Sequence, residues 1–367
     1  MKNINILVIG STGKLGIKLL NFCMKHKIKI DTATCYKNHK IIINQKKKFK
    51  INNIYTLSND QYKTKFIKLI KNRKFHIIYF LDYGSDSLYY ANLLLENQKN
   101  SIFAIANKEM LIAGGNFFIN KIYNTNNKLV PLDSEHYSLF NSNFTNKNIN
   151  KVLITASGGP FYFNKNIDLN NVSKKQVLSH PKWKMGYNNL IDSSNFINKI
   201  LEIFELSFIY KIDLSKIDFL ISKDAFIHSI IIYKDKTLSL NCFENDMLIT
   251  LSKPLTYFYN IDMKFNYNKL LKNDLFKMHK FTDNRFKIIK KFNIIKKFKH
   301  SEVIQFMLIN NLAQKLYLSE KIRYSDIVNF IFKRIDFSKK NINLNNCDEI
   351  LSYINTIKQN LKKNENI

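Results

Sequence analysis

Short apolar runs alternate with amphipathic stretches of helical length over the first 130 residues. Stretches such as Leu15–Lys25 and Gln61–Lys71 carry apolar side chains at helical spacing, and the runs between them have the length of buried strands. This alternation predicts βαβ units and a doubly wound parallel sheet. The predicted strands are Ile4–Ile9, Ile28–Cys35, Ile51–Leu57, Phe75–Leu81, Ile102–Ala106 and Leu129–Leu132.

The pattern changes after residue 150. Predicted strands now follow one another more closely, with helices at Lys174–Leu178 and Ser194–Leu206, which is typical of an α+β domain. These strands are Val152–Thr155, Phe219–Ser222, Ser229–Tyr233 and Thr237–Phe243. A basic stretch without clear periodicity precedes three predicted helices, Val303–Leu318, Tyr324–Arg334 and Glu349–Leu361.

We therefore predict an α/β protein with an N-terminal Rossmann-like parallel sheet, an α+β domain and a small C-terminal helical domain. The predicted boundaries are 1–132 for the first domain, 133–258 for the second, 259–299 for a linker and 300–367 for the helical domain.

The composition excludes several classes of protein. The chain has 367 residues and 45% hydrophobic residues, enough for a large buried core. No apolar run reaches the roughly 18 residues of a membrane span, and the chain enters a predicted strand at once, so we expect no signal or transit peptide. Its four cysteines form no CxxC pair, so we expect neither disulfides nor a zinc site, and a cytoplasmic location.

The net charge of +30 raises the question of nucleic-acid binding. Only four of the 58 basic residues are arginine, the residue that supplies most bidentate and stacking contacts to nucleic acids. Lysine is abundant everywhere, including loops and helix surfaces. We therefore expect no nucleic-acid partner, although the charge favours anionic substrates.

Three carboxylates are candidates for a metal site. Asp133 and Glu135 follow an apolar run at spacing i, i+2, which at a strand end directs both side chains to one side. Glu202 lies on a predicted helix further along the chain. Three oxygen ligands of this kind suit Mg²⁺ or Mn²⁺.

The segment before Glu202 carries groups that suit a phosphate. Ser193 stands near a predicted helix start, where main-chain N–H groups favour anions. Asn198 and Lys199 lie four and three residues before Glu202, so on a helix the three side chains share one face. The sequence therefore predicts a metal site and a phosphate site close together.

A glycine-rich turn after the first strand predicts a dinucleotide site. In Gly10–Gly16 the glycines permit a tight turn, a close approach of a pyrophosphate and helix–strand packing. No carboxylate ends the second strand, and Lys37 and Asn38 follow at the place of a ribose 2′-phosphate. This favours NADP over NAD.

Four further motifs admit two interpretations each. Ala106–Glu109 ends a strand and is either a ligand contact or a helix cap at Asn107. Thr155–Phe161 is an anion-binding turn or a structural one. His180–Gly186 holds the one tryptophan, which is either a core residue or an exposed residue on a mobile lid. His228 lies in an apolar strand, where a core histidine is the simpler interpretation.

Taken in order, these motifs resemble the 1-deoxy-D-xylulose 5-phosphate reductoisomerase family of the non-mevalonate isoprenoid pathway. The resemblance covers roughly residues 1–255 and continues more weakly through Asp283–Phe286, Asn310–Asn311 and Tyr324–Ile327. It implies NADPH, a divalent metal (Mg²⁺, Mn²⁺ or Co²⁺), a phosphorylated ketose as substrate and a homodimer. The implied reaction rearranges the ketose to a branched aldehyde and reduces it to 2-C-methyl-D-erythritol 4-phosphate.

The resemblance also implies a role for each matching residue. The metal ligands are Asp133, Glu135 and Glu202, with Lys108 near the metal and the nicotinamide. The substrate residues are Ser134, Ser157, His180, Trp183, Met185, Ser193, Asn198, Lys199 and His228, with His180, Trp183 and Met185 on a flap. The cofactor residues are Gly10, Ser11, Thr12, Gly13, Lys14, Leu15, Lys37, Asn38, Asn107, Lys108, Glu109 and Gly186.

The chain departs from the family pattern without losing a ligand. The replacements are Lys14 for a small residue, Tyr36 and Ile200 for glycines, Lys223-Asp224 for a Pro-Gln pair, Leu248 for an arginine and Leu312 for an acidic residue. Two alternatives stay open at this point. One is a metal-independent NADP-dependent reductase of another phosphorylated aldehyde, and the other is a non-catalytic remnant that acts as a binding protein.

Overall fold

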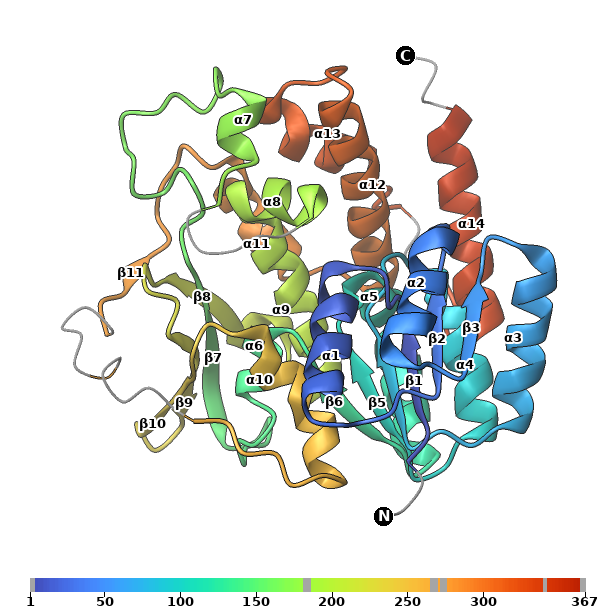
Figure 1. Ribbon diagram of the computed structural model, residues 1–367. Helices are drawn as coiled ribbons and strands as arrows, with labels where there is room; N and C mark the ends of the chain where they lie inside the picture. The colour runs from blue at the N-terminus through green and yellow to red at the C-terminus, as the bar shows by residue number, and fades with distance from the viewer. Residues whose placement is uncertain (1–3, 181–185, 265–269, 271–275, 339–341, 364–367) are drawn as a thin grey trace. The chain divides into compact units, whose positions relative to one another are not determined.

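The computed structural model describes residues 4–180, 186–264, 270, 276–338 and 342–363, and the chain forms two compact units (Figure 1). Unit 1 comprises Met1–Asn141 and Glu244–Asn266, and unit 2 comprises Ser142–Phe243 and Tyr267–Ile367. No helix among the described residues is long and apolar enough to cross a membrane.

Unit 1 is built on a six-stranded parallel sheet in the order β3-β2-β1-β4-β5-β6. The predicted parallel sheet is confirmed, although several paired segments are shorter than the apolar runs. β1 and β4 lie at its centre and are fully buried, because helices cover both faces. The strands are β1 Ile6–Ile9, β2 Thr32–Cys35, β3 Asn53–Thr56, β4 Ile77–Phe80, β5 Ile102–Ile105 and β6 Lys128–Pro131.

The helices of unit 1 form two groups. α1 contacts α2 and α10, whereas α3 contacts α4, which contacts α5, as expected for a doubly wound sheet. The short α6 follows β6 and contacts α10. These helices are α1 Lys14–Lys25, α2 His39–Phe49, α3 Asp60–Asn72, α4 Ser87–Asn97, α5 Lys108–Asn124, α6 Ser134–Ser138 and α10 Met247–Ser252, which is followed by the 3₁₀ turn η2 Lys253–Tyr257.

The segment 244–266 returns to unit 1 after the chain has passed through unit 2. The hydroxyl of the buried Tyr79 on β4 donates a 2.8 Å hydrogen bond to the Leu251 carbonyl on α10. Lys18 Nζ on α1 lies 2.7 Å from Asp246 Oδ1. These long-range contacts place α10 in unit 1, whereas the sequence-based boundary assigned residues 133–258 to one domain.

Unit 2 contains a mixed five-stranded sheet in the order β10-β9-β7-β8-β11. β7 and β8 are parallel, and β9 is antiparallel to both of its neighbours, β7 and β10, which gives the predicted α+β arrangement. The strands are β7 Ile149–Ala156, β8 Ile217–Ile221, β9 Ile227–Tyr233, β10 Leu238–Cys242 and β11 His279–Lys280.

The C-terminal helices belong to unit 2. α12 packs against α8, and the Asn310 amide donates to both carboxylate oxygens of the buried Asp192, at 3.1 and 3.0 Å. The predicted linker 259–299 also holds regular structure. The helical elements of unit 2 are α7 Lys174–Val177, α8 Tyr187–Ser194, α9 Ile197–Tyr210, η1 Leu214–Lys216, η4 Lys287–Lys291, α11 Phe292–Ile295, α12 His300–Leu318, η5 Tyr324–Asp326, α13 Ile327–Arg334 and α14 Cys347–Lys363.

One predicted helix is wrong at its start. We predicted a helix at Ser194–Leu206, but α8 ends at Ser194 and α9 begins at Ile197. Phe196 has φ +67°, which breaks the helix, and the Asn195 side chain accepts a hydrogen bond from the Ile197 N–H. Ser193 therefore lies in the last turn of α8, so the argument that a helix start there favours a phosphate no longer applies.

Candidate active site

The glycine-rich turn has the geometry of a tight strand–helix connection. Gly10 has φ +86°, and a Cβ there would lie 2.5 Å from the Asp82 main-chain nitrogen. A Cβ on Gly16 would lie 2.3 Å from the Ser11 carbonyl oxygen, so α1 approaches the turn as closely as glycine permits. The turn ends at Gly13, and α1 begins at Lys14.

The loop after β2 lies beside this turn. The Asn38 side chain donates a 3.3 Å hydrogen bond to the Thr12 hydroxyl. Lys37 is exposed and its ammonium lies 5.5 Å from the centre of the Tyr36 ring, which is 67% exposed. Lys37 and Asn38 therefore stand next to the glycine turn, as a contact to a dinucleotide requires.

The end of β5 carries a capped helix start. Asn107 accepts a 2.9 Å hydrogen bond from the Met110 N–H, which confirms the helix-cap interpretation, and its amide donates to Asp82 Oδ1 at 3.1 Å. Glu109 is 9% exposed, and burial raises the pKa of its carboxyl. The Lys108 side chain instead contacts Asp133, one of the candidate metal ligands.

Asp133 and Glu135 lie at the start of α6. A carboxylate oxygen of one lies within 4.8 Å of a carboxylate oxygen of the other. Their proximity is not due to strand alternation, because β6 ends at Pro131 and Asp133 caps α6 by accepting from the Glu135 N–H at 3.2 Å. Lys108 Nζ lies 2.5 Å from Asp133 Oδ2, and the Ser134 hydroxyl donates to Glu135 Oε2 at 2.5 Å.

In unit 2, two of the predicted motifs meet through a glycine pair. Gly158 and Gly159 follow Ser157 with φ +88° and +56°, conformations that favour glycine. A Cβ on Gly159 would lie 2.8 Å from the Ser193 carbonyl oxygen. The main chain of this turn therefore packs directly on the end of α8, and the motifs of Ser157 and Ser193 adjoin.

Glu202 on α9 is enclosed by its neighbours on the same helix face. Its side chain is only 3% exposed, and that of Lys199 is 6% exposed. Lys199 forms an ion pair with Glu202 Oε2, and the Asn198 amide donates to Glu202 Oε1. The predicted helix face is confirmed. These partners compensate the charge of a buried carboxylate, which would otherwise be costly to bury.

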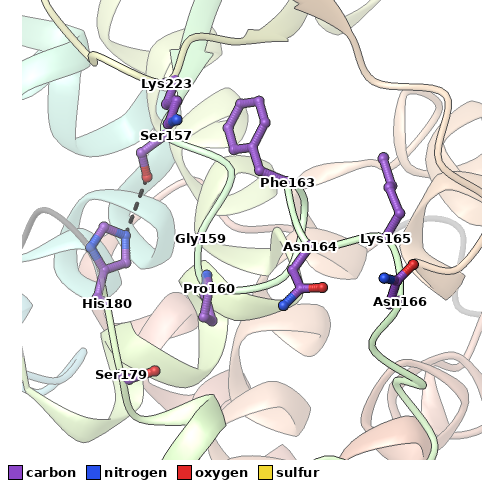
Figure 2. Close-up of a pocket in the computed structure, with 10 residues that line it drawn as sticks. All are labelled: Ser157, Gly159, Pro160, Phe163, Asn164, Lys165, Asn166, Ser179, His180 and Lys223. Carbon is purple, nitrogen blue, oxygen red and sulfur yellow. Dashed lines mark hydrogen bonds between the residues drawn. The ribbon is translucent and has the colours of Figure 1, made fainter.

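His180 lies beside Ser157, the residue before the glycine pair of unit 2. Its Nε2 is 3.2 Å from the Ser157 hydroxyl, and both residues line a cavity of about 830 Å³ (Figure 2). Burial and the positive charge of Lys199 lower the pKa of His180 to about 4. The imidazole is therefore neutral near pH 7, and it offers a hydrogen bond rather than a charge.

The remaining predicted residues have varied surroundings. Trp183 and Met185 lie outside the described residues. Gly186 precedes α8, with no heavy atom within 4 Å of where a Cβ would stand. His228 is 2% exposed, stacks on Phe243 with ring centres 4.0 Å apart, and has Nε2 3.3 Å from the Phe243 carbonyl oxygen. His228 is therefore a buried residue whose role in substrate binding stays a prediction.

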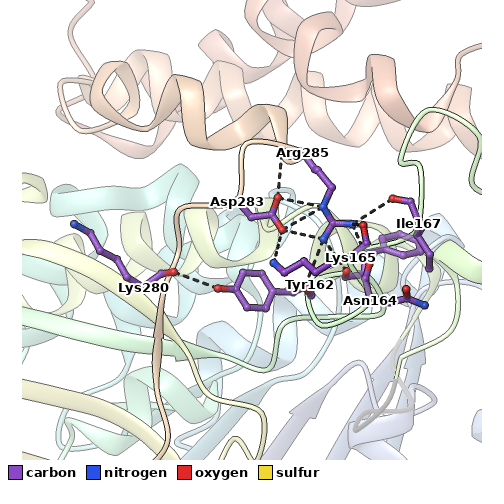
Figure 3. A network of polar contacts seen from close by, with 8 residues as sticks. Tyr162, Asn164, Lys165, Ile167, Lys280, Asp283 and Arg285 are labelled. Atoms are coloured by element: carbon purple, nitrogen blue, oxygen red, sulfur yellow. Dashed lines mark hydrogen bonds and ion pairs between the residues drawn. The ribbon is translucent and has the colours of Figure 1, made fainter.

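Two supporting residues were missed by the sequence analysis. His136 is fully buried, and its Nδ1 lies 3.6 Å from Asp133 Oδ1, so it helps to orient that carboxylate. Its position three residues after Asp133 was the available signal. Arg285 was noted only as part of a weak motif, but it lies at the centre of the network of polar contacts shown in Figure 3.

Arg285 holds the segment that follows Gly158 and Gly159. Its guanidinium donates to the carbonyls of Phe161, Asn164 and Ile167 at 3.2, 2.9 and 3.2 Å, and to Asp283 Oδ2 at 2.8 Å (Figure 3). Burial raises the pKa of Asp283, but hydrogen bonds from Arg285 and Lys165 outweigh this effect and hold it well below its usual range.

Arg285→Ala is expected to lower the free energy of unfolding by about 2–3 kcal/mol, because several charge-assisted hydrogen bonds are lost together. Denaturant unfolding of purified protein measures this change. Arg323→Ala is the matched control, since Arg323 is an exposed arginine of the same unit, and it should change the value by less than about 0.5 kcal/mol. Equal effects of the two substitutions would contradict the assignment.

Comparison with known proteins identifies similar chains over nearly the whole length. A family model described as the 1-deoxy-D-xylulose 5-phosphate reductoisomerase C-terminal domain matches residues 129–210. The 1-deoxy-D-xylulose 5-phosphate reductoisomerase of Pelagibacter ubique is 30% identical over 379 aligned residues, covering 94% of this chain and 95% of that protein. The apicoplastic enzyme of Plasmodium falciparum is 29% identical, covering 95% of this chain and 79% of that protein.

Solved structures share the fold. A crystal structure of DOX-P reductoisomerase in complex with NADPH, fosmidomycin and magnesium has a TM-score of 0.86 and 20% identity, covering 98% of each chain. The reductoisomerase of Zymomonas mobilis in complex with NADPH has a TM-score of 0.80 and 21% identity, covering 97% of each chain.

Proposed function

The chain belongs to the 1-deoxy-D-xylulose 5-phosphate reductoisomerase family, and from this we propose that it converts 1-deoxy-D-xylulose 5-phosphate to 2-C-methyl-D-erythritol 4-phosphate in non-mevalonate isoprenoid biosynthesis. It is an NADP-dependent oxidoreductase that also isomerises its substrate, and it uses NADPH and a divalent metal. The observation that carries the proposal is the 30% identity to a reductoisomerase over 94% of the chain.

We propose Asp133, Glu135 and Glu202 as the metal ligands. The donor set fits the ion, because hard carboxylate oxygens suit Mg²⁺, and two of the three carboxylates already lie within 4.8 Å of each other on α6. Lys108 and His136 orient Asp133, and Asn198 and Lys199 orient Glu202. When bound, the metal acts as a Lewis acid that polarises the substrate carbonyl.

We propose that Ser157, Ser193, Asn198 and Lys199 bind the substrate phosphate. Support comes from the packing of Gly159 on the Ser193 main chain and from the common helix face of Asn198 and Lys199. Anchoring the non-reacting end of the substrate supplies binding energy that orients the reacting end. His180, Trp183 and Met185 would close over this end and exclude water, and His228 would line the site.

We propose that the glycine turn binds the NADPH pyrophosphate and that Lys37 and Asn38 bind the ribose 2′-phosphate. Support comes from Gly10 and Gly16, because only glycine permits the tight turn and the close approach of α1 that a pyrophosphate-binding turn of this kind has. Asn107, Lys108, Glu109 and Gly186 would contact the nicotinamide half, which supplies hydride when the cofactor is bound.

NADPH should be preferred over NADH, and Lys37→Ala should reduce that preference by about tenfold, since loss of about 1.4 kcal/mol in binding is a tenfold change. The reason is the exposed ammonium beside the glycine turn. The measurement is kcat/KM for both cofactors. Lys47→Ala, an exposed lysine on α2, serves as control and should leave the preference unchanged. Equal use of both cofactors by the wild type would refute the assignment of this loop.

The test of the function is substrate-dependent oxidation of NADPH with and without EDTA. Turnover of 1-deoxy-D-xylulose 5-phosphate that EDTA abolishes and Mg²⁺ restores supports the proposal. Turnover of another phosphorylated aldehyde that resists EDTA would indicate a metal-independent reductase. Absence of turnover with intact cofactor binding would indicate a non-catalytic binding protein.

Three finer features follow from the family resemblance. We propose that Mn²⁺, and also Co²⁺, can replace Mg²⁺, because both accept the same oxygen ligands. We propose a homodimer, which sedimentation of the purified protein would test. We propose a cytoplasmic location, for which the four free cysteines are support, because reduced thiols are typical of that compartment.

A further inference from the structure

The cavity next to Ser157 contains a lysine that the family pattern does not. Ser157 and His180 line this cavity together with Lys165, Phe163 and Lys223, all within unit 2 (Figure 2). The resemblance to the family implies a proline at the position of Lys223, so the ammonium group is a departure of this chain from that pattern.

The two lysines of the cavity differ in what they contact. Lys165 Nζ lies 2.7 Å from Asp283 Oδ2 and 4.2 Å from the centre of the Tyr162 ring, so its charge is already compensated. Lys223 is exposed, its ammonium lies 5.8 Å from the centre of the Phe163 ring, and it forms no ion pair with any residue that the structure describes. Lys223 is therefore the lysine of this cavity whose charge remains available to an anion.

Phe163 connects Lys223 to the predicted phosphate loop. A Cβ on Gly158 would lie 2.8 Å from a carbon of the Phe163 ring, so this ring packs directly on the residue after Ser157. The ammonium of Lys223 lies near the same ring, 5.8 Å from its centre. A hydroxyl, a neutral imidazole and a cation thus border one cavity, which is the chemistry that a phosphate dianion recognises.

We propose that Lys223 is a specificity-determining residue that attracts and binds the phosphate end of the substrate at the edge of the Ser157–His180 cavity. This inference rests on the proposed function and extends it, because the added charge favours a phosphorylated ketose over its non-phosphorylated form. An exposed cation acts chiefly through long-range attraction, so its effect depends on ionic strength.

The experiment compares Lys223→Gln, Lys223→Arg and the control Lys236→Gln. Lys236 is an exposed lysine in the turn at the far end of β9 from Lys223. Lys223→Gln should raise KM for 1-deoxy-D-xylulose 5-phosphate by about three- to tenfold at low salt, with kcat changed less than about twofold. The difference from wild type should shrink at about 0.5 M salt, and Lys223→Arg should restore KM. An unchanged KM in Lys223→Gln, or an equal rise in Lys236→Gln, would overturn the inference.

A second readout does not depend on turnover. Inorganic phosphate should raise the melting temperature of the wild type and of Lys236→Gln more than that of Lys223→Gln. If the wild type does not turn over the ketose phosphate but this difference is observed, the anion site stands and the proposed function fails. Equal stabilisation of all variants by phosphate would overturn the anion site whatever the activity.

Discussion

Glu202→Gln is expected to abolish metal-dependent turnover, with a loss of about a thousandfold or more in kcat/KM. A Lewis-acid metal contributes several kcal/mol to the transition state, and about 4 kcal/mol corresponds to a thousandfold. Glutamine keeps the size of the side chain but removes one of three proposed anionic ligands. NADPH binding should change less than a few-fold, because Glu202 belongs to unit 2 and the glycine turn to unit 1.

The measurement is NADPH oxidation over a range of Mg²⁺ concentrations, together with fluorescence titration of NADPH. Glu205→Gln is the matched control, since Glu205 is another buried glutamate on α9, 1% exposed. It should retain metal-dependent turnover. Activity of Glu202→Gln close to the wild type at saturating Mg²⁺ would remove Glu202 from the ligand set.

Lys199→Ala is expected to raise KM for the phosphorylated substrate by about 10- to 100-fold, because a charge-assisted contact to phosphate contributes roughly 1.5–3 kcal/mol. Discrimination against 1-deoxy-D-xylulose, which has no phosphate, should disappear. The structure adds a second effect. Since Lys199 is buried and paired with Glu202, its loss leaves an uncompensated carboxylate and should also lower the melting temperature.

Two variants separate these effects. Lys199→Arg keeps the positive charge and should recover more of the stability than of the substrate affinity, because the guanidinium differs in shape from the ammonium. Lys211→Ala replaces an exposed lysine at the end of α9 and should change neither quantity. An unchanged KM in Lys199→Ala would show that Lys199 serves Glu202 and not the phosphate.

Local periodicity was sufficient to predict most of the secondary structure. All six strands of the first sheet were found, because each lies between stretches of helical spacing and the central strands are continuous apolar runs. The face shared by Asn198, Lys199 and Glu202 was also predictable, since helical spacing is a local property. The break at Phe196 was missed, because a positive φ on a phenylalanine is imposed by its surroundings and has no local sequence signal.

The sequence by itself determined the βαβ alternation, the glycine turn and the identity of the candidate ligands, all of which depend on residue types at short spacing. Only the tertiary structure decided that Asp133 caps α6, that segment 244–266 returns to unit 1 and that Arg285 holds the carbonyls after Gly159. The same holds for Lys223, one lysine of many in the sequence, which becomes distinct only beside the Ser157 cavity. The physical reason is that these features are contacts between residues distant in the chain, and the free energy of such contacts depends on burial and partner geometry that no short segment encodes.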